Sequence, residues 1–454
     1  MAIEYPFIKS GIVHATINGH RFHLRLKDPT EDNFLWIDGR ILLVLDTVAA
    51  DFVSYIIESM WLFQQGSMNQ SDKVKDFVID KMKKKYVRFS PLFCKKITAE
   101  QLRDDLDRIY GTIIGIADGQ CPVDAALELK EVDIGQWIAP ARMDLAVTYM
   151  CNLNCPHCYT WSGPNSDIQE LSFDEWARIL DKLWEIGIPN VVFTGGEPTL
   201  REDIVKLVDK AKQFVTGLIT NGTKLVELSG PLKEASLDYI QVTLESHLSQ
   251  VHNKMAGASF DAFSQTVAGI KYALGLGMQV VTNTTLTREN AFQFNELLKF
   301  GKDIGLSNMS CNTLICSGRG IEAKKETGLS LDEIKSVLEK AIDVAKNLNI
   351  KLQWYSPTCY LHLNPIELGF GAKGCSAAAY NMTIQPDGTV LPCQSWPETV
   401  GNILNDSWEK IWNNPICLKL RNHGFAQEDI ICRDCIHNQI CGGACPLESK
   451  GDKL

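Results

Sequence analysis

The sequence predicts an α/β fold built around a parallel β-sheet. The prediction rests on a repeated strand–helix pattern, on helix-capping motifs and on the length of the chain. From about residue 194 a short β-rich run, a turn and an amphipathic helix recur at roughly 25 to 30 residues. Capping boxes at Ser172 to Glu175 and Ser330 to Glu333 open two of these helices. The 454 residues, 45% hydrophobic and 22% charged, suffice for two or three domains with a large core. The alternation implies right-handed crossovers, in a doubly wound sheet or a full or partial barrel.

The first 130 residues predict a separate, small α+β module. Their strand-like runs cover residues 12–17, 21–26, 33–37 and 41–45. A long helix follows, then the basic stretch 73–85 and a helix over residues 98–110.

The repeating part predicts six strands, and its functional side chains should lie where those strands end. The expected strands are residues 143–149, 190–194, 217–220, 239–244, 278–285 and 306–315. The helix after Ser172 should close near Gly187. From Lys373 onward the periodicity fades and Gly, Pro, Asn and Cys dominate, so this segment needs a metal or cluster as a staple.

Charge and hydropathy exclude several classes of protein. The net charge is −10 and the longest basic run is Lys83 to Lys85, which argues against nucleic acid or an acidic membrane as partner. The longest apolar stretch, residues 41–57, is interrupted by Asp46 and Asp51 and is shorter than the ~20 residues of a spanning helix. The N-terminus does not resemble a signal peptide, so we expect a cytoplasmic protein.

Fifteen cysteines are the most informative feature of the composition. In a reducing compartment, clustered cysteines are metal or cluster ligands rather than disulfides. Cys151, Cys155 and Cys158 follow the first barrel strand, and three thiolates can hold a four-iron cluster with one iron free. The alternative is a zinc site with His157 as fourth ligand.

Gly195, Gly196, Glu197 and Pro198 end the second barrel strand, where glycines let backbone approach a ligand closely. Together with the Cys-x3-Cys-x2-Cys loop, this turn resembles the radical SAM superfamily. The resemblance implies a partial (β/α)6 TIM-type barrel and a four-iron cluster that binds S-adenosylmethionine. The Gly-Gly-Glu-Pro turn would hold the methionine amino group, and a 5′-deoxyadenosyl radical would abstract a substrate hydrogen.

The same resemblance suggests further contacts to S-adenosylmethionine, at the ends of later strands. Thr243 and Glu245 replace the serine and aspartate that often contact the ribose in relatives. His252 could act as a base, but we expect a surface histidine. The other candidate contacts are Tyr159, Asn221, Asn283, Thr285 and Arg319.

The C-terminal cysteines resemble the SPASM extension, which carries two auxiliary four-iron clusters. The matching residues are Cys375, Gly388, Cys393, Cys432, Cys435, Cys441 and Cys445. The resemblance implies that Cys445 joins Cys375 and Cys393 in the first auxiliary cluster, and we expect Cys359 to complete that site. Three cluster sites in all are expected. The alternative is that these cysteines form a zinc ribbon, a structural zinc site.

The chain departs from that family in two places. The second auxiliary cluster lacks a downstream cysteine, so its fourth ligand could be Cys417, Asp434, Asp452 or solvent. Gln394 follows Cys393 where sulfatase-maturing relatives place an aspartate as a base, which makes sulfatase maturation less favoured.

The N-terminal module resembles a PqqD-like, winged-helix-like domain, which binds leader peptides by adding a strand to its sheet. Its basic residues Lys73 to Lys85 could steer an acidic leader, or simply form a solvated helix face. The expected domains are residues 1–115 for recognition, 116–140 as linker, 141–355 as partial barrel and 356–454 as the iron-sulfur domain.

The sequence therefore predicts a maturase that modifies a ribosomally synthesised precursor peptide, most simply by a thioether or C–C cross-link. Its partners would be a precursor peptide with a leader and a reductase, flavodoxin or ferredoxin as electron donor. One alternative is a radical SAM/SPASM dehydrogenase of a protein or cofactor precursor. Another, from a different class, is a zinc-stapled binding protein without catalysis.

Overall fold

The computed structural model describes residues 12–17, 20–26, 33–37, 41–64, 71–86, 98–118, 137–164 and 168–451. The chain divides into two compact units, one before residue 134 and one that contains nearly all of the rest. We describe each unit by itself.

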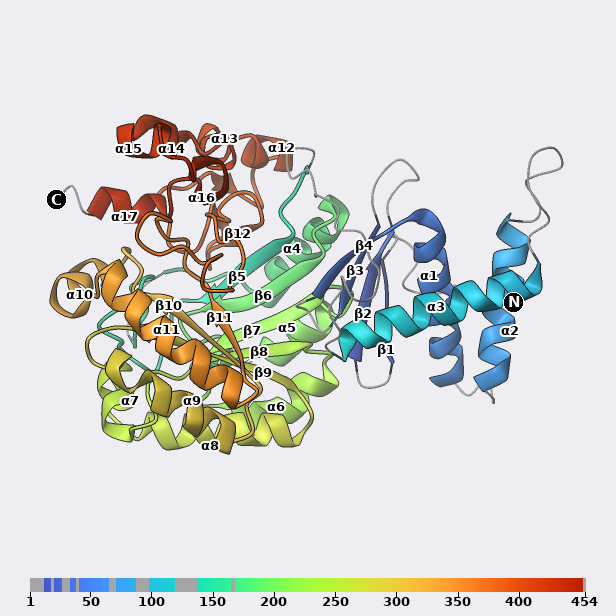
Figure 1. Cartoon of the computed structure of the whole chain (residues 1–454), viewed down its shortest axis with the longest axis horizontal. Coiled ribbons are helices and arrows are strands. Elements are labelled where there is room, and N and C mark those ends of the chain that lie inside the picture. Colours follow the sequence, from blue (N-terminus) through green and yellow to red (C-terminus); the bar gives the residue numbers. More distant parts are fainter. Residues whose placement is uncertain are drawn as a thin grey trace. The chain divides into compact units, whose positions relative to one another are not determined.

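Within its described residues, the N-terminal unit contains a four-stranded antiparallel sheet and three helices (Figure 1). The strands, in the order β1-β2-β3-β4, are Ile12–Ile17, His20–Arg25, Asn33–Ile37 and Ile41–Leu45. The helices are α1 (Thr47–Gln64), α2 (Ser71–Tyr86) and α3 (Ala99–Ala117). The helix predicted over residues 98–110 thus continues to Ala117, with Thr98 as N-cap in a capping box. Most of the predicted linker 116–140 lies outside the described residues.

The second unit contains a ten-stranded sheet, in which seven parallel strands follow chain order from β5 to β11. They are Arg142–Thr148, Asn190–Gly195, Val215–Thr220, Tyr239–Thr243, Gln279–Leu286, Asn308–Thr313 and Lys351–Trp354. The six predicted strands are confirmed, and β11 adds a short seventh. Because β11 and β5 do not pair with each other, the parallel strands form an open, partial barrel.

Helices between these strands cover the sheet, and Figure 1 shows α6, α8 and α9 along its lower margin. Both predicted capping boxes are confirmed, at Ser172 before α4 and Ser330 before α11. Gly187 ends α4 in the left-handed region at φ 91°, as the sequence predicts. The helices are α4 (Phe173–Ile186), α5 (Ile204–Lys210), α6 (Leu225–Glu234), α7 (Ser249–Met255), α8 (Ala262–Gly275), α9 (Phe294–Asp303), α10 (Gly320–Thr327) and α11 (Leu331–Asn347).

The C-terminal part extends the large sheet beyond β5. Strand β12 (Asn381–Ile384) pairs parallel with β5, and β13 (Thr389–Leu391) and β14 (Gly401–Asn402) continue antiparallel. Six short helices follow: α12 (Trp408–Trp412), α13 (Pro415–Arg421), α14 (Gly424–Glu428), α15 (Ile430–Arg433), α16 (Asn438–Cys441) and α17 (Pro446–Gly451).

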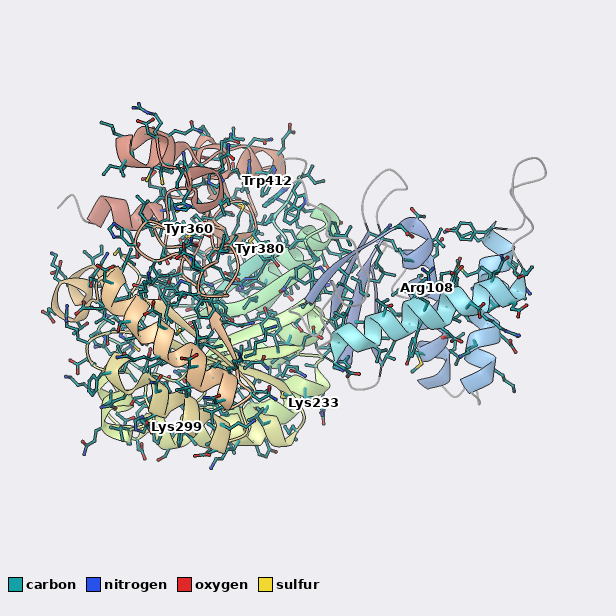
Figure 2. All side chains as sticks on the ribbon, viewed as in Figure 1. Arg108, Lys233, Lys299, Tyr360, Tyr380 and Trp412 are labelled. Atoms are coloured by element: carbon teal, nitrogen blue, oxygen red, sulfur yellow. The ribbon has the colours of Figure 1, made fainter. Side chains whose placement is uncertain are left out.

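Aromatic side chains supply part of the packing in this C-terminal part, where Figure 2 labels Tyr360, Tyr380 and Trp412. The Arg421 guanidinium lies 4.0 Å from the centre of the Trp412 ring and donates to the backbone oxygens of Ala378 and Trp412. These contacts fix loops that regular structure does not. In the described part of the chain, the helices are all too short or too polar to span a bilayer.

Candidate active site

Cys151, Cys155 and Cys158 lie in the loop after β5, at the carboxyl end of the parallel strands. Burial raises the pKa of Cys151 to about 12, and Glu197 and Cys158 add to this. Burial also raises the pKa of Cys155, with Cys158 and Cys151 as the next causes. The pKa values of Cys151 and Cys155 thus respond to neighbouring thiols of the loop, as expected for sulfurs held in one short segment.

The two glycines of the Gly-Gly-Glu-Pro turn let β6 approach the cysteine loop. A Cβ on Gly195 would lie 2.0 Å from the backbone oxygen of Thr148, and one on Gly196 2.3 Å from that of Met150. Gly195 also has φ +131°, a conformation that disfavours other residues. The backbone N–H of Gly196 donates to the Thr148 oxygen at 2.7 Å. Glycine is thus required by the approach of the two backbones.

Glu197 is fully buried and fixes this turn to the end of β7. Its carboxylate accepts hydrogen bonds from the N–H and hydroxyl of Thr199, the hydroxyl of Thr220 and the N–H of Asn221. Burial raises the pKa of Glu197, and these hydrogen bonds oppose the rise. Thr199 and Thr220 were not predicted as partners of Glu197. A hydroxyl residue near a carboxylate at a strand end could have indicated such a hydrogen bond.

Asn221 connects β7 to the cysteine loop. Its Nδ2 donates to Asn152 Oδ1 at 2.8 Å, and its side chain also hydrogen bonds with the sulfur of Cys151. Asn152 in turn donates to Thr223 Oγ1 at 3.0 Å. The predicted cofactor contact therefore also positions the loop.

Glu245 follows β8 and is buried against the same loop. Its Oε1 lies 3.2 Å from His157 Nε2, and its Oε2 accepts from the N–H of Thr285 at 2.9 Å. His252 is also buried and accepts a hydrogen bond from the N–H of Glu245. The prediction of a surface histidine at 252 is wrong, because α7 carries this side chain inward, where burial lowers its pKa.

Arg319 binds the cysteine loop through backbone oxygens. Its Nε donates to the oxygen of Cys155 and its Nη2 to that of Ser162, each at 2.8 Å. Its own N–H donates to the oxygen of Cys158, also at 2.8 Å. A guanidinium suits this task because its donors have a fixed planar geometry.

The remaining predicted contacts line one face of the sheet. Thr243, Asn283 and Thr285 are half-buried in strands whose neighbouring residues are buried, so they share the less enclosed face of the sheet. Thr243 and Asn283 are paired neighbours in β8 and β9, and Asn283 Nδ2 donates to Asn312 at 2.7 Å. The structure brings them toward the same end of the sheet as the cysteine loop.

Tyr159 links the cysteine loop to the C-terminal part. Its hydroxyl donates to Gln394 Oε1, and Gln394 directly follows Cys393. Burial raises the pKa of Tyr159, so the phenol stays protonated as a donor. An amide oxygen thus occupies the place where relatives were expected to carry a base.

The C-terminal cysteines form two groups. In the first, the pKa of Cys445 is raised by burial and by the thiols of Cys375 and Cys393. In the second, the pKa of Cys359 and Cys432 is raised by burial and by thiols of the same group, which consists of Cys359, Cys432, Cys435 and Cys441.

The sequence predicts Cys359 with the first group, whereas the structure places the preceding residue, Thr358, against Cys441 of the second group. The Cys441 thiol donates to the backbone oxygen of Thr358 at 3.5 Å, so the turn that carries Cys359 packs against α16. Of the suggested fourth ligands, Cys417 is buried on α13 and Asp434 is exposed beside Arg433. Asp452 lies outside the described residues.

The donor set fits iron-sulfur clusters. At several of these cysteines, the backbone N–H of the residue two positions later donates to the sulfur. Such hydrogen bonds stabilise the thiolate and shift the reduction potential of a bound cluster. Such pairs are Leu153 with Cys151, Ala377 with Cys375, Ser395 with Cys393, His437 with Cys435 and Leu447 with Cys445. Across the described ranges, no three His, Cys, Asp or Glu side chains could hold one metal ion. A four-iron cluster spreads its thiolates over different irons, so its ligands need not converge on a single point.

Comparisons with known proteins agree with this geometry. Residues 145–301 match the family model of the Radical SAM superfamily, and residues 375–436 match SPASM, an iron-sulfur cluster-binding domain. A PqqA peptide cyclase of Bradyrhizobium diazoefficiens is 27% identical over 322 residues, covering 68% of this chain and 82% of that protein. An AdoMet-dependent heme synthase of Oleidesulfovibrio alaskensis is 26% identical over 322 residues, covering 65% of this chain and 80% of that protein.

Solved structures share the fold. Streptococcus suis SuiB bound to the precursor peptide SuiA superposes with a TM-score of 0.61 at 16% identity, covering 97% of this chain and 95% of that one. The structure of anSMEcpe with bound AdoMet gives a TM-score of 0.52 at 17% identity, covering 67% of this chain and 88% of that one.

Proposed function

Because the chain contains a radical SAM domain and a SPASM domain, which bind S-adenosylmethionine and 4Fe–4S clusters, we propose that it is a maturase of a ribosomally made precursor peptide. The fold similarity to SuiB carries this proposal, because it spans 97% of this chain and so includes the N-terminal unit. The peptide cyclase relative supports the same substrate class. The reaction would begin at a residue of the core peptide and end in a thioether or C–C cross-link.

In this proposal Cys151, Cys155 and Cys158 hold the catalytic cluster. When bound, the cluster and S-adenosylmethionine supply a radical that abstracts hydrogen. Gly195 and Gly196 bring the backbone close to the loop, and Glu197 fixes the turn from within. Arg319 and Asn221 hold the loop in one conformation, which keeps the bound groups at a fixed distance from the substrate.

The contacts proposed for the nucleoside part are Thr243, Glu245 and Asn283, with Pro198 and Tyr159 closing the site. Glu245 is already bonded to His157 and Thr285, so its carboxylate would position the loop as well. Two auxiliary clusters bound by the C-terminal cysteines complete a proposed total of three.

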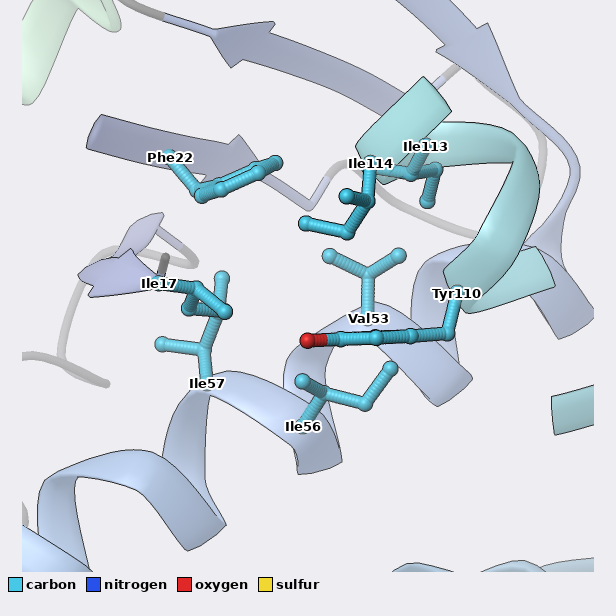
Figure 3. Close-up of a pocket in the computed structure, with 8 residues that line it drawn as sticks. All are labelled: Ile17, Phe22, Val53, Ile56, Ile57, Tyr110, Ile113 and Ile114. Carbon is cyan, nitrogen blue, oxygen red and sulfur yellow. The ribbon is translucent and has the colours of Figure 1, made fainter. Parts of the chain in front are cut away.

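The N-terminal unit is the proposed leader-recognition domain. Its β1 and β4 form the two edges of the described sheet, and an added strand could pair with either edge. Figure 3 shows an apolar pocket between the sheet and helices α1 and α3, with the Tyr110 ring reaching in beside Val53 and Ile56. Ile17 of β1 lines this pocket, but its volume of about 20 Å³ is too small for a side chain, so the proposed leader contact is strand pairing at a sheet edge.

A first experiment asks whether the chain has the proposed chemistry. Anaerobically reconstituted protein with dithionite and S-adenosylmethionine should release 5′-deoxyadenosine and contain roughly eight to twelve irons per chain. About two zinc ions and no iron would instead indicate the non-catalytic binding protein.

A second experiment asks for the substrate. Short peptides encoded beside the gene are incubated with the enzyme, a reductase with flavodoxin or ferredoxin, and S-adenosylmethionine, and then measured by mass spectrometry. A loss of about two mass units per site supports oxidation or cross-linking, because two hydrogens leave in either case. An unchanged mass with inverted stereochemistry would mean epimerisation, and unmodified peptides would count against a peptide substrate.

The heme synthase relative favours a second candidate, a dehydrogenase of a cofactor precursor, since it matches 65% of this chain at 26% identity. Deleting the N-terminal unit separates the two candidates. A maturase should lose peptide modification but keep cleavage of S-adenosylmethionine, whereas turnover of a small precursor should not need the unit.

A further inference from the structure

The turn at Thr358 to Leu363 holds Cys359 against the second cysteine group. Thr358 is fully buried, and its hydroxyl donates to the oxygen of Leu363 at 3.0 Å. The N–H groups of His362 and Leu363 donate to the oxygen of Cys359 at 3.1 and 2.9 Å. The turn is closed by its own hydrogen bonds, so the backbone that carries Cys359 is held in one conformation.

Two contacts place this turn beside the cysteines of α15 and α16. The Cys441 thiol lies 3.5 Å from the oxygen of Thr358, the residue before Cys359. The ring of Tyr360, the residue after it, packs on His437 with centroids 6.1 Å apart, and His437 donates to the sulfur of Cys435 at 3.4 Å. Cys359 is therefore flanked on both sides by contacts to the second group.

The sulfur of Cys359 also has the surroundings of a ligand. The N–H of Leu361 donates to it from two residues onward, as at the other proposed ligands. Cys417 differs in its surroundings. Burial raises its pKa to about 11, and the group that lowers it is the Arg421 side chain rather than a backbone N–H. A buried hydrophobic thiol does not need N–H donors, whereas a cluster thiolate does.

We propose that Cys359 is the fourth ligand of the second auxiliary cluster, together with Cys432, Cys435 and Cys441. The proposal rests on the proposed function only in that both require the C-terminal domain to bind clusters. With this assignment, the first group has three cysteine ligands, Cys375, Cys393 and Cys445, and it is this group that lacks a fourth among the described residues. The second cluster is then closed by cysteine on every iron.

The test measures iron and sulfide in the reconstituted full chain. Cys359→Ala should lower iron by up to about four per chain, while the matched control Cys417→Ala keeps the wild-type content. The decisive variant adds Cys359→Ala to Cys432→Ala/Cys435→Ala, which already lacks the second cluster. Here no further iron should be lost, because both changes affect the same cluster.

Each other outcome overturns a specific statement. A further loss of about four irons in the combined variant would assign Cys359 to the first cluster. Equal iron in Cys359→Ala and wild type, with the same electron paramagnetic resonance spectrum, would show that Cys359 is no ligand. Wild-type protein without iron would refute the proposed function itself.

The variant Cys359→Ser distinguishes loss of a cluster ligand from misfolding of the chain. Serine keeps the shape of the side chain and offers an oxygen ligand, so iron should stay near the wild-type content while the spectrum of one cluster changes. An unchanged spectrum in this variant would contradict the proposal.

Discussion

Cys151, Cys155 and Cys158 lie within one short loop, whereas the C-terminal cysteine groups are assembled from distant parts of the chain. Cys441 and Thr358, in contact at 3.5 Å, are 83 positions apart. The loop is held by side chains from later strand ends, namely Glu197, Asn221, Glu245 and Arg319. The C-terminal groups instead depend on short helices and turns, with N–H donors close to the cysteines in sequence. A ligand set in one loop is readable from its spacing alone, whereas the group to which a distant cysteine such as Cys359 belongs depends on how the chain folds.

If the two regions are independent sites, removing the loop cysteines should leave the C-terminal iron. The variant Cys151→Ala/Cys155→Ala/Cys158→Ala should abolish cleavage of S-adenosylmethionine and lower iron by about four per chain. Deoxyadenosine release and iron analysis check this, with Cys417→Ala as control. Residual cleavage would mean that the reactive cluster lies elsewhere, and loss of all iron would mean that the regions assemble together.

The stability of the loop region should also fall when the buried carboxylate of Glu197 is replaced. Glu197→Gln keeps the size of the side chain but turns an amide NH2 toward hydrogen-bond donors, which should cost roughly 2 to 4 kcal/mol of unfolding free energy. Denaturant unfolding followed by circular dichroism measures this. The surface control Glu202→Gln should stay within about 0.5 kcal/mol. Equal stability of both variants would show that the hydrogen bonds of Glu197 do not hold the turn.

A smaller effect is expected where Arg319 bridges two backbone oxygens. Arg319→Lys keeps the charge but loses the planar pair of donors, so about 1 to 3 kcal/mol should be lost and the loop cluster should release iron faster to a chelator. Arg288→Lys is the matched control, since Arg288 pairs with Glu333 on the surface. If both variants release iron at the same rate, Arg319 is not a positioning residue for the loop.

The fold was predictable because its signals are local. The six barrel strands and the capping boxes at Ser172 and Ser330 follow from periodicity and cap chemistry within a few residues. β11 to β14 were missed because they are only two to four residues long, too short for a period to emerge. Their pairing depends on the neighbouring strand rather than on their own sequence.

The site was predictable to the extent that its residues form a motif. Gly195 and Gly196 could be expected from the close approach they permit. The inward direction of His252 and the neighbours of Cys359 could not, because each is decided by packing between elements far apart in sequence. Spacing between cysteines limits which sulfurs can share a cluster, but it does not determine the choice.

The smallest expected effect concerns His252, which lies beneath the loop. Burial lowers its pKa, while Glu245 and Asp261 act in the opposite direction. The unfolded chain therefore takes up a proton below pH about 6.5 before the folded chain does, and stability falls as the pH falls through that range. His252→Asn can still accept from the N–H of Glu245 but cannot titrate, so part of the acid destabilisation between pH 7 and 5 should disappear. Unfolding midpoints across this range measure the difference, and parallel pH profiles for wild type and variant would show that His252 does not contribute.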